Sequence, residues 1–369
     1  MAALRFRATN TSDAGVGWQL PFAMTVYTID PVSDSRWAEF VGKHPAASIF
    51  HTPEWLEALR RTYSYKPIAI TTSPLGCSLT NGIPFCGISS WLGGRRLVSL
   101  PFSDHCAPLA EDSTGLTSLL ASLRESVDRK KWKCAEIRTT GSLLSDSEGF
   151  EESKSFFLHK LDLRPCLDDI FRNFHKDCVQ RKIQRAMREG LTQETGRSAL
   201  LLDQFYRLLL MTRRRHGVPP QPLAWFRNLV SCLGDKVKIR IASKGENPVA
   251  GILTLQNKQR LVYKYGCSDE RFNQLGGMQM LLWKAIEDAK TGQVTEFDMG
   301  RSDCANSGLV TFKDRWGATR TRLTYLRYPR VRFRSIRDAT QGNISKRIFA
   351  CMPNGLLTAT GRVLYKYLG

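Results

Sequence analysis

Apolar residues along the chain follow two spacings: an alternation typical of strands and a three-to-four-residue repeat typical of amphipathic helices. Between residues 24 and 139 the two patterns interchange several times. They predict strands at about 24–30, 66–72, 83–90, 96–101 and 134–139, and helices at about 34–42, 53–62 and 115–131. Thr52-Pro53 supports the second helix, because a threonine N-cap followed by proline is a common helix start.

The remainder of the chain has a different order of elements. We expect strands at about 156–163, 237–241, 249–255, 260–266, 294–298 and 321–328, and helices at about 168–189, 199–216, 278–290 and 306–316. An antiparallel meander followed by strand, helix and strand makes the two strands that flank the long helix parallel. If these two strands splay at their ends, the gap between them exposes backbone groups that can hold an amide-bearing acyl donor.

A length of 369 residues suits two domains better than one. The layout of Val98–Asp104, a helix and Ala135–Arg138 recurs as Val262–Asp269, a helix and Glu296–Asp298, which favours a duplication. We therefore predict an α/β (α+β) protein of two domains with separate mixed sheets; one continuous sheet would argue against the duplication. The expected divisions are a tail at 1–23, a first domain at 24–155 with 329–369 packing back on it, and a second, catalytic domain at 156–328.

The composition excludes several classes of protein. The hydrophobic content of 42% is that of a folded globular chain, and no apolar run approaches the roughly 18–20 residues that span a bilayer. Residues 1–23 lack the unbroken apolar stretch of a secretory signal. The ten cysteines are widely spaced and the six histidines scattered, so we expect reduced thiols in a cytoplasmic protein and no metal site.

The net charge of +20 is unevenly distributed. Residues 1–150 hold 15 basic and 14 acidic side chains, so almost all of the excess lies in the second part of the chain. A one-sided basic surface attracts phosphates, whether of nucleic acid, of anionic lipid or of a nucleotide-linked substrate. General basicity that aids solubility is the alternative, and the concentration of charge in one part of the chain makes it less attractive.

Five stretches in this order carry a family resemblance. They are Phe50-His-Thr-Pro-Glu-Trp55, Leu100-Pro-Phe-Ser-Asp-His-Cys-Ala-Pro108, Arg181–Gly190, Phe297-Asp-Met-Gly-Arg301 with Gly308–Gly317, and the C-terminal Leu356–Gly369. Together they resemble the Fem-like acyltransferases of the GNAT (N-acetyltransferase-like) superfamily, from Met24 to the end of the chain. The last stretch resembles the tails of relatives linked to exopolysaccharide loci.

The resemblance implies tandem GNAT-like domains and a direct transfer of an acyl or aminoacyl group to an amine. The co-substrate it implies is acyl-CoA or aminoacyl-tRNA, with no permanently bound cofactor. The acceptor would be a glycan or a peptidoglycan-type precursor, either free or lipid-linked. In the Fem enzymes the Phe-Lys pair that corresponds to Phe312-Lys313 contacts the aminoacyl end of the donor, which makes Lys313 the first catalytic candidate.

Lys313 suits the chemistry of acyl transfer, because a fixed cation beside the carbonyl oxygen stabilises the tetrahedral intermediate. Asp298 is the second candidate. A carboxylate at the end of a parallel strand can accept the proton of the attacking amine. The alternative for Asp298 is a structural role, holding Arg301 or capping the next helix.

The candidate binding residues are more dispersed. Arg301 and Asn306 lie in a polar turn and can orient phosphate or sugar, although turn residues need no function. Gly276-Gly277 can direct backbone N–H groups at a phosphate, but Asn273-Gln-Leu-Gly-Gly departs from the usual CoA loop and leaves tRNA open as donor. The basic helix face of Lys176, Arg181 and Arg185 is a phosphate site or simply a solvated face. The aromatic candidates for ligand contact are Tyr263, Tyr265, Phe312 and Trp316.

His105 and Cys106 suggest a nucleophile with its base, but no other hydrolase signature accompanies them, so we interpret them as cleft-lining or structural. The alternative function is a non-catalytic GNAT-fold protein that binds phosphate or RNA. Lys313 and Asp298 discriminate between the two: convergence on an open cleft favours catalysis, and separation or burial in salt bridges favours binding.

The C-terminal region is a candidate membrane contact. Residues 320–347 contain nine basic side chains and one acidic one, Asp338. Beyond Pro353, one side of a short helix would carry Leu356, Leu357, Val363, Leu364, Tyr367 and Leu368. That side either docks on the first domain or contacts an anionic membrane, so we expect a cytoplasmic protein with a reversible peripheral contact through 320–369.

Overall fold

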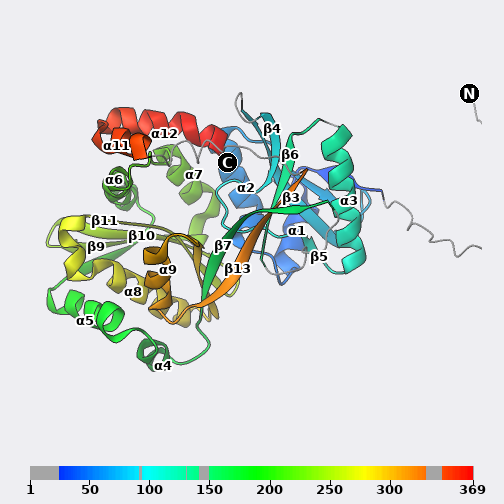
Figure 1. The fold of residues 1–369 in the computed structure, drawn as a ribbon. Coiled ribbons are helices and arrows are strands. Elements are labelled where there is room, and N and C mark those ends of the chain that lie inside the picture. Colours follow the sequence, from blue (N-terminus) through cyan, green and yellow to red (C-terminus); the bar gives the residue numbers. More distant parts are fainter. Residues whose placement is uncertain (1–24, 91–93, 130, 141–148, 330–342, 369) are drawn as a thin grey trace, which may run out of the picture.

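A computed structural model describes residues 25–90, 94–129, 131–140, 149–329 and 343–368 (Figure 1). The predicted tail at 1–23 and the basic residues between 330 and 342 lie outside this range. The first part of the chain contains the elements that the hydrophobic pattern predicts, with a short turn of helix and strand β5 in addition. They are β1 (Tyr27–Ile29), α1 (Ser35–Lys43), η1 (Ile49–His51), α2 (Pro53–Tyr63), β2 (Pro67–Thr71), β3 (Asn81–Ser90), β4 (Gly94–Ser99), β5 (Leu109–Ala110), α3 (Ser113–Arg129) and β6 (Cys134–Thr140).

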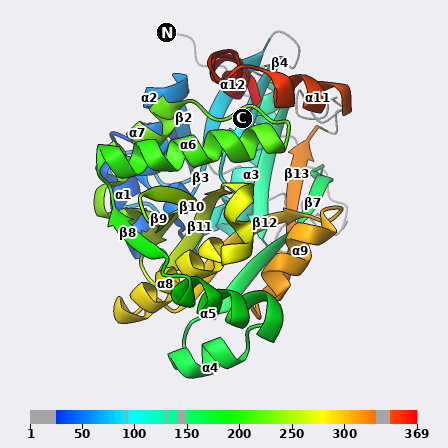
Figure 2. The ribbon, with the colours of Figure 1, turned by 90° about the vertical axis from the view of Figure 1, so that its left-hand side faces the viewer.

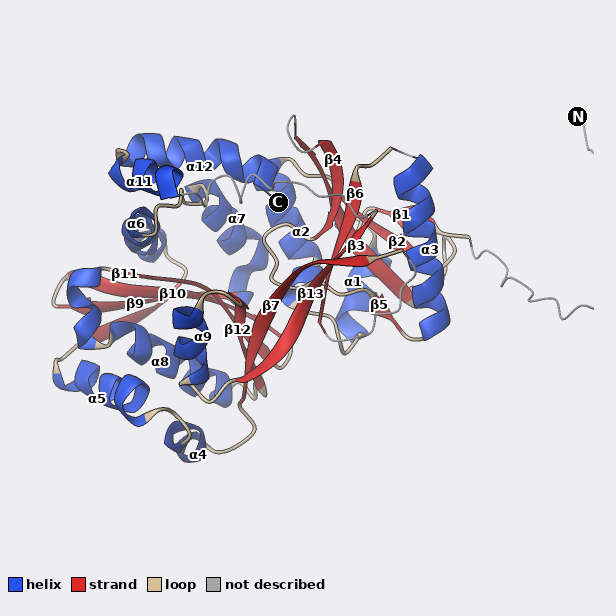
Figure 3. Cartoon of the chain, viewed as in Figure 1, coloured by secondary structure: helices blue, strands red, loops and turns tan. Residues whose placement is uncertain are grey.

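The second part also follows the predicted order (Figure 3). Its elements are β7 (Glu151–Asp162), α4 (Leu167–Arg172), η2 (Lys176–Gln180), α5 (Arg181–Arg188), β8 (Thr192–Gly196), α6 (Ala199–Arg215), α7 (Leu223–Leu233), η3 (Gly234–Lys236), β9 (Val237–Lys244), β10 (Asn247–Asn257), β11 (Arg260–Ser268), η4 (Glu270–Leu275), α8 (Gly277–Thr291), β12 (Glu296–Asp303), α9 (Ser307–Asp314), β13 (Thr319–Tyr328), α11 (Asn343–Cys351) and α12 (Asn354–Leu368).

Two local predictions are wrong. The expected helix at 168–189 is interrupted at residues 173–175, where the ring of His175 accepts hydrogen bonds from the backbone N–H groups of Asp177 and Cys178 at 3.2 and 3.3 Å and starts a new helical segment. Strand β8 was not predicted. Its sequence is entirely polar or glycine and mostly exposed, so it lacks the alternation by which a strand is recognised.

The expectation of two separate sheets is also wrong, because one mixed sheet runs through the molecule. Its strand order is β1-β2-β3-β4-β6-β13-β7-β12-β11-β10-β9-β8. Strand β7 follows β6 in the chain but pairs with β12, whereas β13 follows β12 but pairs with β6. The two long strands also pair with each other (Figure 1). This exchange gives partners to strand edges that two separate sheets would leave open.

Within the continuous sheet the internal repeat is still visible. Strand β4 is antiparallel to β3 and parallel to β6, and helix α3 connects β4 to β6. Strand β11 is likewise antiparallel to β10 and parallel to β12, with α8 as the connection. We call residues 25–140 the first half and residues 167–316 the second half, with β7 and β13 between them.

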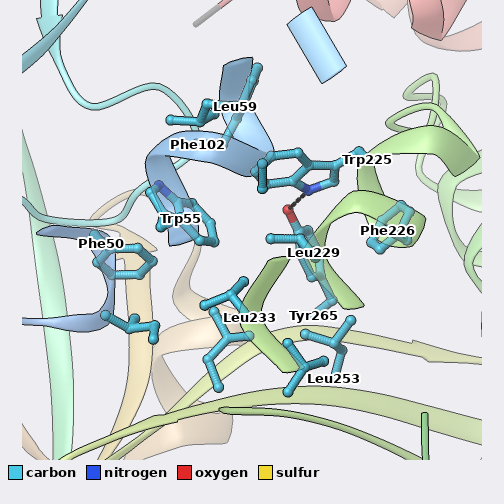
Figure 4. Close-up of a cluster of buried hydrophobic side chains, with 14 of the residues drawn as sticks. Phe50, Trp55, Leu59, Phe102, Trp225, Phe226, Leu229, Leu233, Leu253 and Tyr265 are labelled. Atoms are coloured by element: carbon cyan, nitrogen blue, oxygen red, sulfur yellow. Dashed lines mark hydrogen bonds between the residues drawn. The ribbon is translucent and has the colours of Figure 1, made fainter. Parts of the chain in front are cut away.

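The largest apolar cluster joins the two halves (Figure 4). Trp55 of α2 and Trp225 of α7 are fully buried, and their rings meet edge to face at 5.2 Å. The indole N–H of Trp225 donates a hydrogen bond of 2.9 Å to the hydroxyl of Tyr265 on β11. Because this cluster is shared, the position of the first half relative to β11 is fixed by side-chain packing.

The C-terminal helix α12 contacts both halves (Figure 2). The hydroxyl of Tyr65 donates to the carbonyl oxygen of Lys366 at 2.9 Å, and the hydroxyl of Tyr365 donates to that of Pro219 at 3.2 Å. The predicted division into domains at 155/156 falls inside β7 and stays a prediction.

Two glycines provide a matched test of the packing between α5 and α8. Gly276 and Gly190 both have positive φ, +81° and +66°, so alanine costs roughly 1–2 kcal/mol of backbone strain at either position. A Cβ at Gly276 would also lie 2.3 Å from the carbonyl oxygen of Lys182, whereas one at Gly190 would meet nothing within 4 Å. We expect Gly276→Ala to lower the midpoint of thermal unfolding clearly more than Gly190→Ala. Equal shifts would mean that α5 moves aside at no cost.

Candidate active site

The site is built where two parallel strands separate. Strands β11 and β12 are in parallel register from Arg260↔Glu296 to Val262↔Asp298, and no pair follows. Beyond Asp298, β12 continues along β7, with an irregularity at Gly300, whose φ is +74°. The predicted parallel pair is therefore confirmed, and its two strands separate after Asp298.

A loop from the first half, residues 100–108, covers this separation; we call it the insert loop. Its His105 ring lies with Nε2 2.9 Å from Oδ2 of Asp298. Its Asp104 carboxylate lies 3.1 Å from Nζ of Lys264 on β11. A Cβ at Gly300 would lie 3.3 Å from Asp104 Oδ2, so the loop approaches β12 at a position suited to glycine.

The insert loop is held by the first half's own parallel strand, β6. The guanidinium of Arg138 donates to the carbonyl oxygens of Leu100 and Ser103 at 2.6 and 3.0 Å, and the backbone N–H of Cys106 donates to the Arg138 carbonyl at 2.8 Å. Arg138 is buried and pairs with Glu136. Burial would raise the pKa of Glu136, but Arg138 and Arg327 bring it down to about 2, so the pair stays ionised.

Lys313 lies on the other side of Gly300, on helix α9. Its side chain is only 2% exposed, and its ammonium donates to the carbonyl oxygens of Gly300 and Arg301 at 2.7 and 2.9 Å. Asp298 accepts a hydrogen bond of 2.7 Å from the N–H of Gly300. The two predicted catalytic residues therefore both form hydrogen bonds with Gly300. The ammonium of Lys313 has a third N–H in addition to the two that donate to these carbonyl oxygens.

Burial dominates the acid–base properties of the cluster. It lowers the pKa of Lys313 to about 8, against the opposing effects of Asp104 and Asp298. It also lowers the pKa of Lys264, whose ammonium lies between the rings of Phe50 and Tyr265 at 5.1 and 5.7 Å. Burial would raise the pKa of Asp104, yet Lys264 and Arg301 hold it at about 2.

Arg301, predicted to bind phosphate, is already engaged by protein groups. Its guanidinium lies over the ring of Phe156 at 4.6 Å and donates to the hydroxyl of Tyr325 at 2.5 Å. That hydroxyl in turn donates to the carbonyl oxygen of Asp104 at 2.8 Å. Arg301 thus helps to position the insert loop.

Several other predicted ligand contacts are packing or capping residues here. Trp316 is fully buried against Phe174, with ring centroids 4.9 Å apart, and Phe312 packs half-buried beside it. Tyr265 is a member of the shared core. For Trp316 and Tyr265 the predicted ligand contact is corrected to a core role. Asn306 is the N-cap of α9, accepting from the N–H of Leu309 at 3.0 Å, which was its structural alternative.

The predicted phosphate loop is occupied by protein atoms. Gly276 faces the backbone of Lys182 on α5, and a Cβ at Gly277 would contact Ala250 and Val249 of the sheet at 3.3 and 3.4 Å. The hydroxyl of Tyr263 lies so close to Gly266 that a Cβ there would overlap it. Close packing therefore explains why glycine stands at positions 276 and 277, the two glycines of the predicted phosphate loop.

The basic helix lies on the surface. Lys176, Arg181 and Arg185 are exposed, and the two arginines form ion pairs with Asp177 and Glu189 at 2.5 and 3.6 Å. This arrangement corresponds to a solvated helix face, and a role in binding phosphate stays a prediction.

Of the two outcomes that discriminate catalysis from binding, the structure has burial, because Lys313 and Asp298 are at most 3% exposed and face no open cleft. A cavity of about 650 Å³ lies at the other end of β11 and β12, lined by residues that include Arg260, Glu296, Lys160 and Lys258. Across the described ranges no group of three or more His, Cys, Asp or Glu side chains could hold a metal ion. In the same ranges no helix is long and apolar enough to cross a membrane.

Sequence reasoning missed the contribution of the first half. Asp104 and His105 are separated from β11 and β12 by more than 150 residues, and His105 was interpreted only as cleft-lining or structural. Nothing in the sequence marked Lys264 as a site residue, since a lysine on a strand of alternating polarity usually points to solvent. The one available hint was the polar Ser-Asp-His run inside an otherwise apolar loop.

Comparison with known proteins identifies the fold. Residues 175–314 match the acetyltransferase (GNAT) domain family. The crystal structure of FemX is similar in fold, with a TM-score of 0.65 and 15% identity over 82% of this chain and 97% of FemX. A tandem GNAT protein from the clavulanic acid biosynthesis pathway covers the same shares at a TM-score of 0.51 and 8% identity. The chain therefore has a tandem GNAT fold, and its second half contains a region that matches the GNAT domain family.

A sequence comparison adds one curated relative. Over 135 residues the chain is 26% identical to the UDP-N-acetylmuramoylpentapeptide-lysine N(6)-alanyltransferase of Weissella viridescens. The match covers 36% of this chain and 40% of that relative's length. The predicted resemblance to Fem-like proteins is thus confirmed, and the chain is a homologue of a Fem alanyltransferase.

The buried ammonium of Lys313 should make stability depend on pH. With a folded pKa of about 8 against 10.5 ordinarily, the unfolded chain binds more protons between these values, so this group makes the folded state more stable as pH rises. We expect the free energy of unfolding of the wild type to increase relative to Lys313→Met from about pH 8 to about pH 10. Lys43→Met is the control, since that side chain is 78% exposed. A pH-independent difference for Lys313→Met would contradict the lowered pKa.

Proposed function

We propose that this protein is an acyltransferase that moves an acyl or aminoacyl group from CoA or tRNA to an amine of a cell-envelope glycan or peptide precursor. The observation that carries the proposal is the convergence of Asp104 and His105 from one half with Asp298 and Lys313 from the other at the β11–β12 separation. In a parallel pair that opens at this point, an acyl donor can replace the missing strand hydrogen bonds. The likeness to a Fem alanyltransferase supports the same chemistry.

The proposed step is a direct attack. The amine nitrogen attacks the carbonyl carbon of the donor, a C–N bond forms, and the bond to the tRNA oxygen or the CoA sulfur breaks. Lys313 directs its remaining N–H at the carbonyl oxygen as negative charge develops there. The proton of the attacking amine passes to the His105–Asp298 pair, and the leaving oxygen or sulfur takes up a proton.

The packing around Gly276 and Gly277 supports aminoacyl-tRNA rather than acyl-CoA as donor. Lys182 and the sheet occupy the space beside both glycines, at the place where a CoA pyrophosphate would approach the helix N-terminus. The exposed Lys176, Arg181 and Arg185 offer a surface for an RNA backbone. We further propose a cytoplasmic location at the inner face of the membrane, where a lipid-linked precursor would be presented.

Lys313→Ala tests the oxyanion role. The acceptor is first identified by mass spectrometry of glycans and peptidoglycan precursors from cells with and without the protein. Turnover is then measured with that acceptor and with charged tRNA or acyl-CoA as donor. We expect Lys313→Ala to lower turnover by about 10²–10³-fold, as loss of an oxyanion donor does, while Lys43→Ala has no effect. Undiminished turnover in a folded Lys313→Ala protein would remove this residue from the mechanism.

The His105–Asp298 pair can be tested by a double-mutant cycle in the same assay. If the two side chains act as one unit, His105→Gln and Asp298→Asn each lower turnover, and the double variant is little worse than the more severe single variant. Because Asp298 also accepts from the Gly300 N–H, thermal unfolding must show that both variants fold. Fully additive losses would indicate that the two residues act separately.

The burial of Lys313 and Asp298 favours a second candidate, a GNAT-fold protein that binds phosphate or RNA without catalysis. In that case the glycans and precursors of cells with and without the protein would be identical. RNA would co-purify with the protein and be released by salt. The same mass-spectrometric comparison therefore separates the two functions.

A further inference from the structure

Helix α12 has two apolar faces instead of the single one predicted from its sequence. Leu357, Gly361 and Tyr365 are spaced four residues apart and face inward, where a Cβ at Gly361 would lie 2.0 Å from the carbonyl oxygen of Pro220. Leu356 and Val363, seven residues apart, are 61% and 60% exposed. The predicted grouping of Leu356 with Leu357 is wrong because adjacent helical residues point about 100° apart.

Helix α11 extends the exposed apolar surface. Its Ile348 is 55% exposed, while Phe349 beside it is buried. The guanidinium of Arg214 on α6 donates to the carbonyl oxygen of Met352 at 2.9 Å and holds the turn between α11 and α12. We call α11 and α12, residues 343–368, the hairpin. Among the described residues, three of the seven large apolar side chains that are exposed lie in it. The two helices run along one outer edge of the molecule (Figure 1).

The charges of the hairpin have one sign. Residues 343–368 contain four basic residues and no Asp or Glu. Arg347, Arg362 and Lys366 are exposed, and none of them forms an ion pair with another described residue. The arginines of β13 are different, because Arg320, Arg322 and Arg327 are paired with Asp314, Glu152 and Glu136. Among the described residues from β13 onward, the positive charge without an ion-pair partner is thus on the hairpin.

We propose that the outer face of α11 and α12, formed by Ile348, Leu356 and Val363 with Arg347, Arg362 and Lys366, docks on the surface of an anionic lipid bilayer. The three apolar side chains enter the head-group layer and the cations lie at the phosphates, which is the arrangement of an interfacial amphipathic helix. The absence of acidic residues from the hairpin selects a negatively charged surface. Three apolar side chains form a small contact for a protein partner but are sufficient beside several lipid-facing cations. This inference specifies the location proposed above and does not depend on acyl transfer.

Co-sedimentation of the full chain with vesicles tests the proposal. We expect binding to vesicles that contain phosphatidylglycerol at low salt, a loss of binding as salt rises, and little binding to pure phosphatidylcholine. Leu356→Ser with Val363→Ser should weaken binding about tenfold or more, and Arg362→Gln with Lys366→Gln roughly 30-fold, as for two cations at the lipid surface.

Matched controls keep the result specific. Leu75→Ser removes a leucine that is 71% exposed elsewhere, and Arg129→Gln removes an arginine that is 69% exposed; neither should change binding. No binding of the wild type at low salt, equal binding to neutral and anionic vesicles, or a loss of the same size in the controls would overturn the proposal. Because no turnover is measured, such a result would leave the proposed acyl transfer standing.

Discussion

The contact between α2 and α7 is the constraint on which the site depends. Trp55 and Trp225 bury their rings against each other and against Tyr265, so the two halves share one core at this point. Burying two tryptophans stabilises a core by several kcal/mol. The same packing sets the insert loop over β12 and surrounds Lys264 with Phe50, Trp55 and Tyr265. A polar site is therefore positioned by an apolar contact that contains none of its reactive groups.

The charges at the site compensate one another. An isolated buried ion is strongly unfavourable, but here Asp104 lies beside Lys264 and Arg301, and Lys313 is bonded to two carbonyl oxygens. Each half supplies part of this balance, since Asp104 and His105 come from the insert loop and the cations come from β11, β12 and α9. Displacing the insert loop would deprive Lys264 of Asp104 and Asp298 of His105, so the loop is required for the geometry of the site.

Most helices and strands were predictable because they follow from the local spacing of apolar residues, and the parallel pair followed from their order; β8 and the break at residues 173–175 were not. The family resemblance named Lys313 and Asp298 as candidates but left open whether they converge; in the structure both bond to Gly300. The exchange of β7 and β13 was not predictable, since the alternation within a strand defines its buried face but not its neighbour. The contacts of His105 and Asp104 were missed because they join residues far apart in the chain. Trp316 and Tyr265 were misassigned because an aromatic residue near a site motif gives no signal of its burial.

The exchanged strands affect how the chain is made and folded. Strand β6 ends at Thr140, and its neighbour β13 begins at Thr319, so about 180 further residues must be synthesised before that edge of β6 is paired. At the usual 5–20 residues per second, the nascent chain carries an incomplete sheet for roughly 10–40 seconds. Pairings of such high contact order form slowly. A strand that is made late thus completes the sheet of the part that is made first.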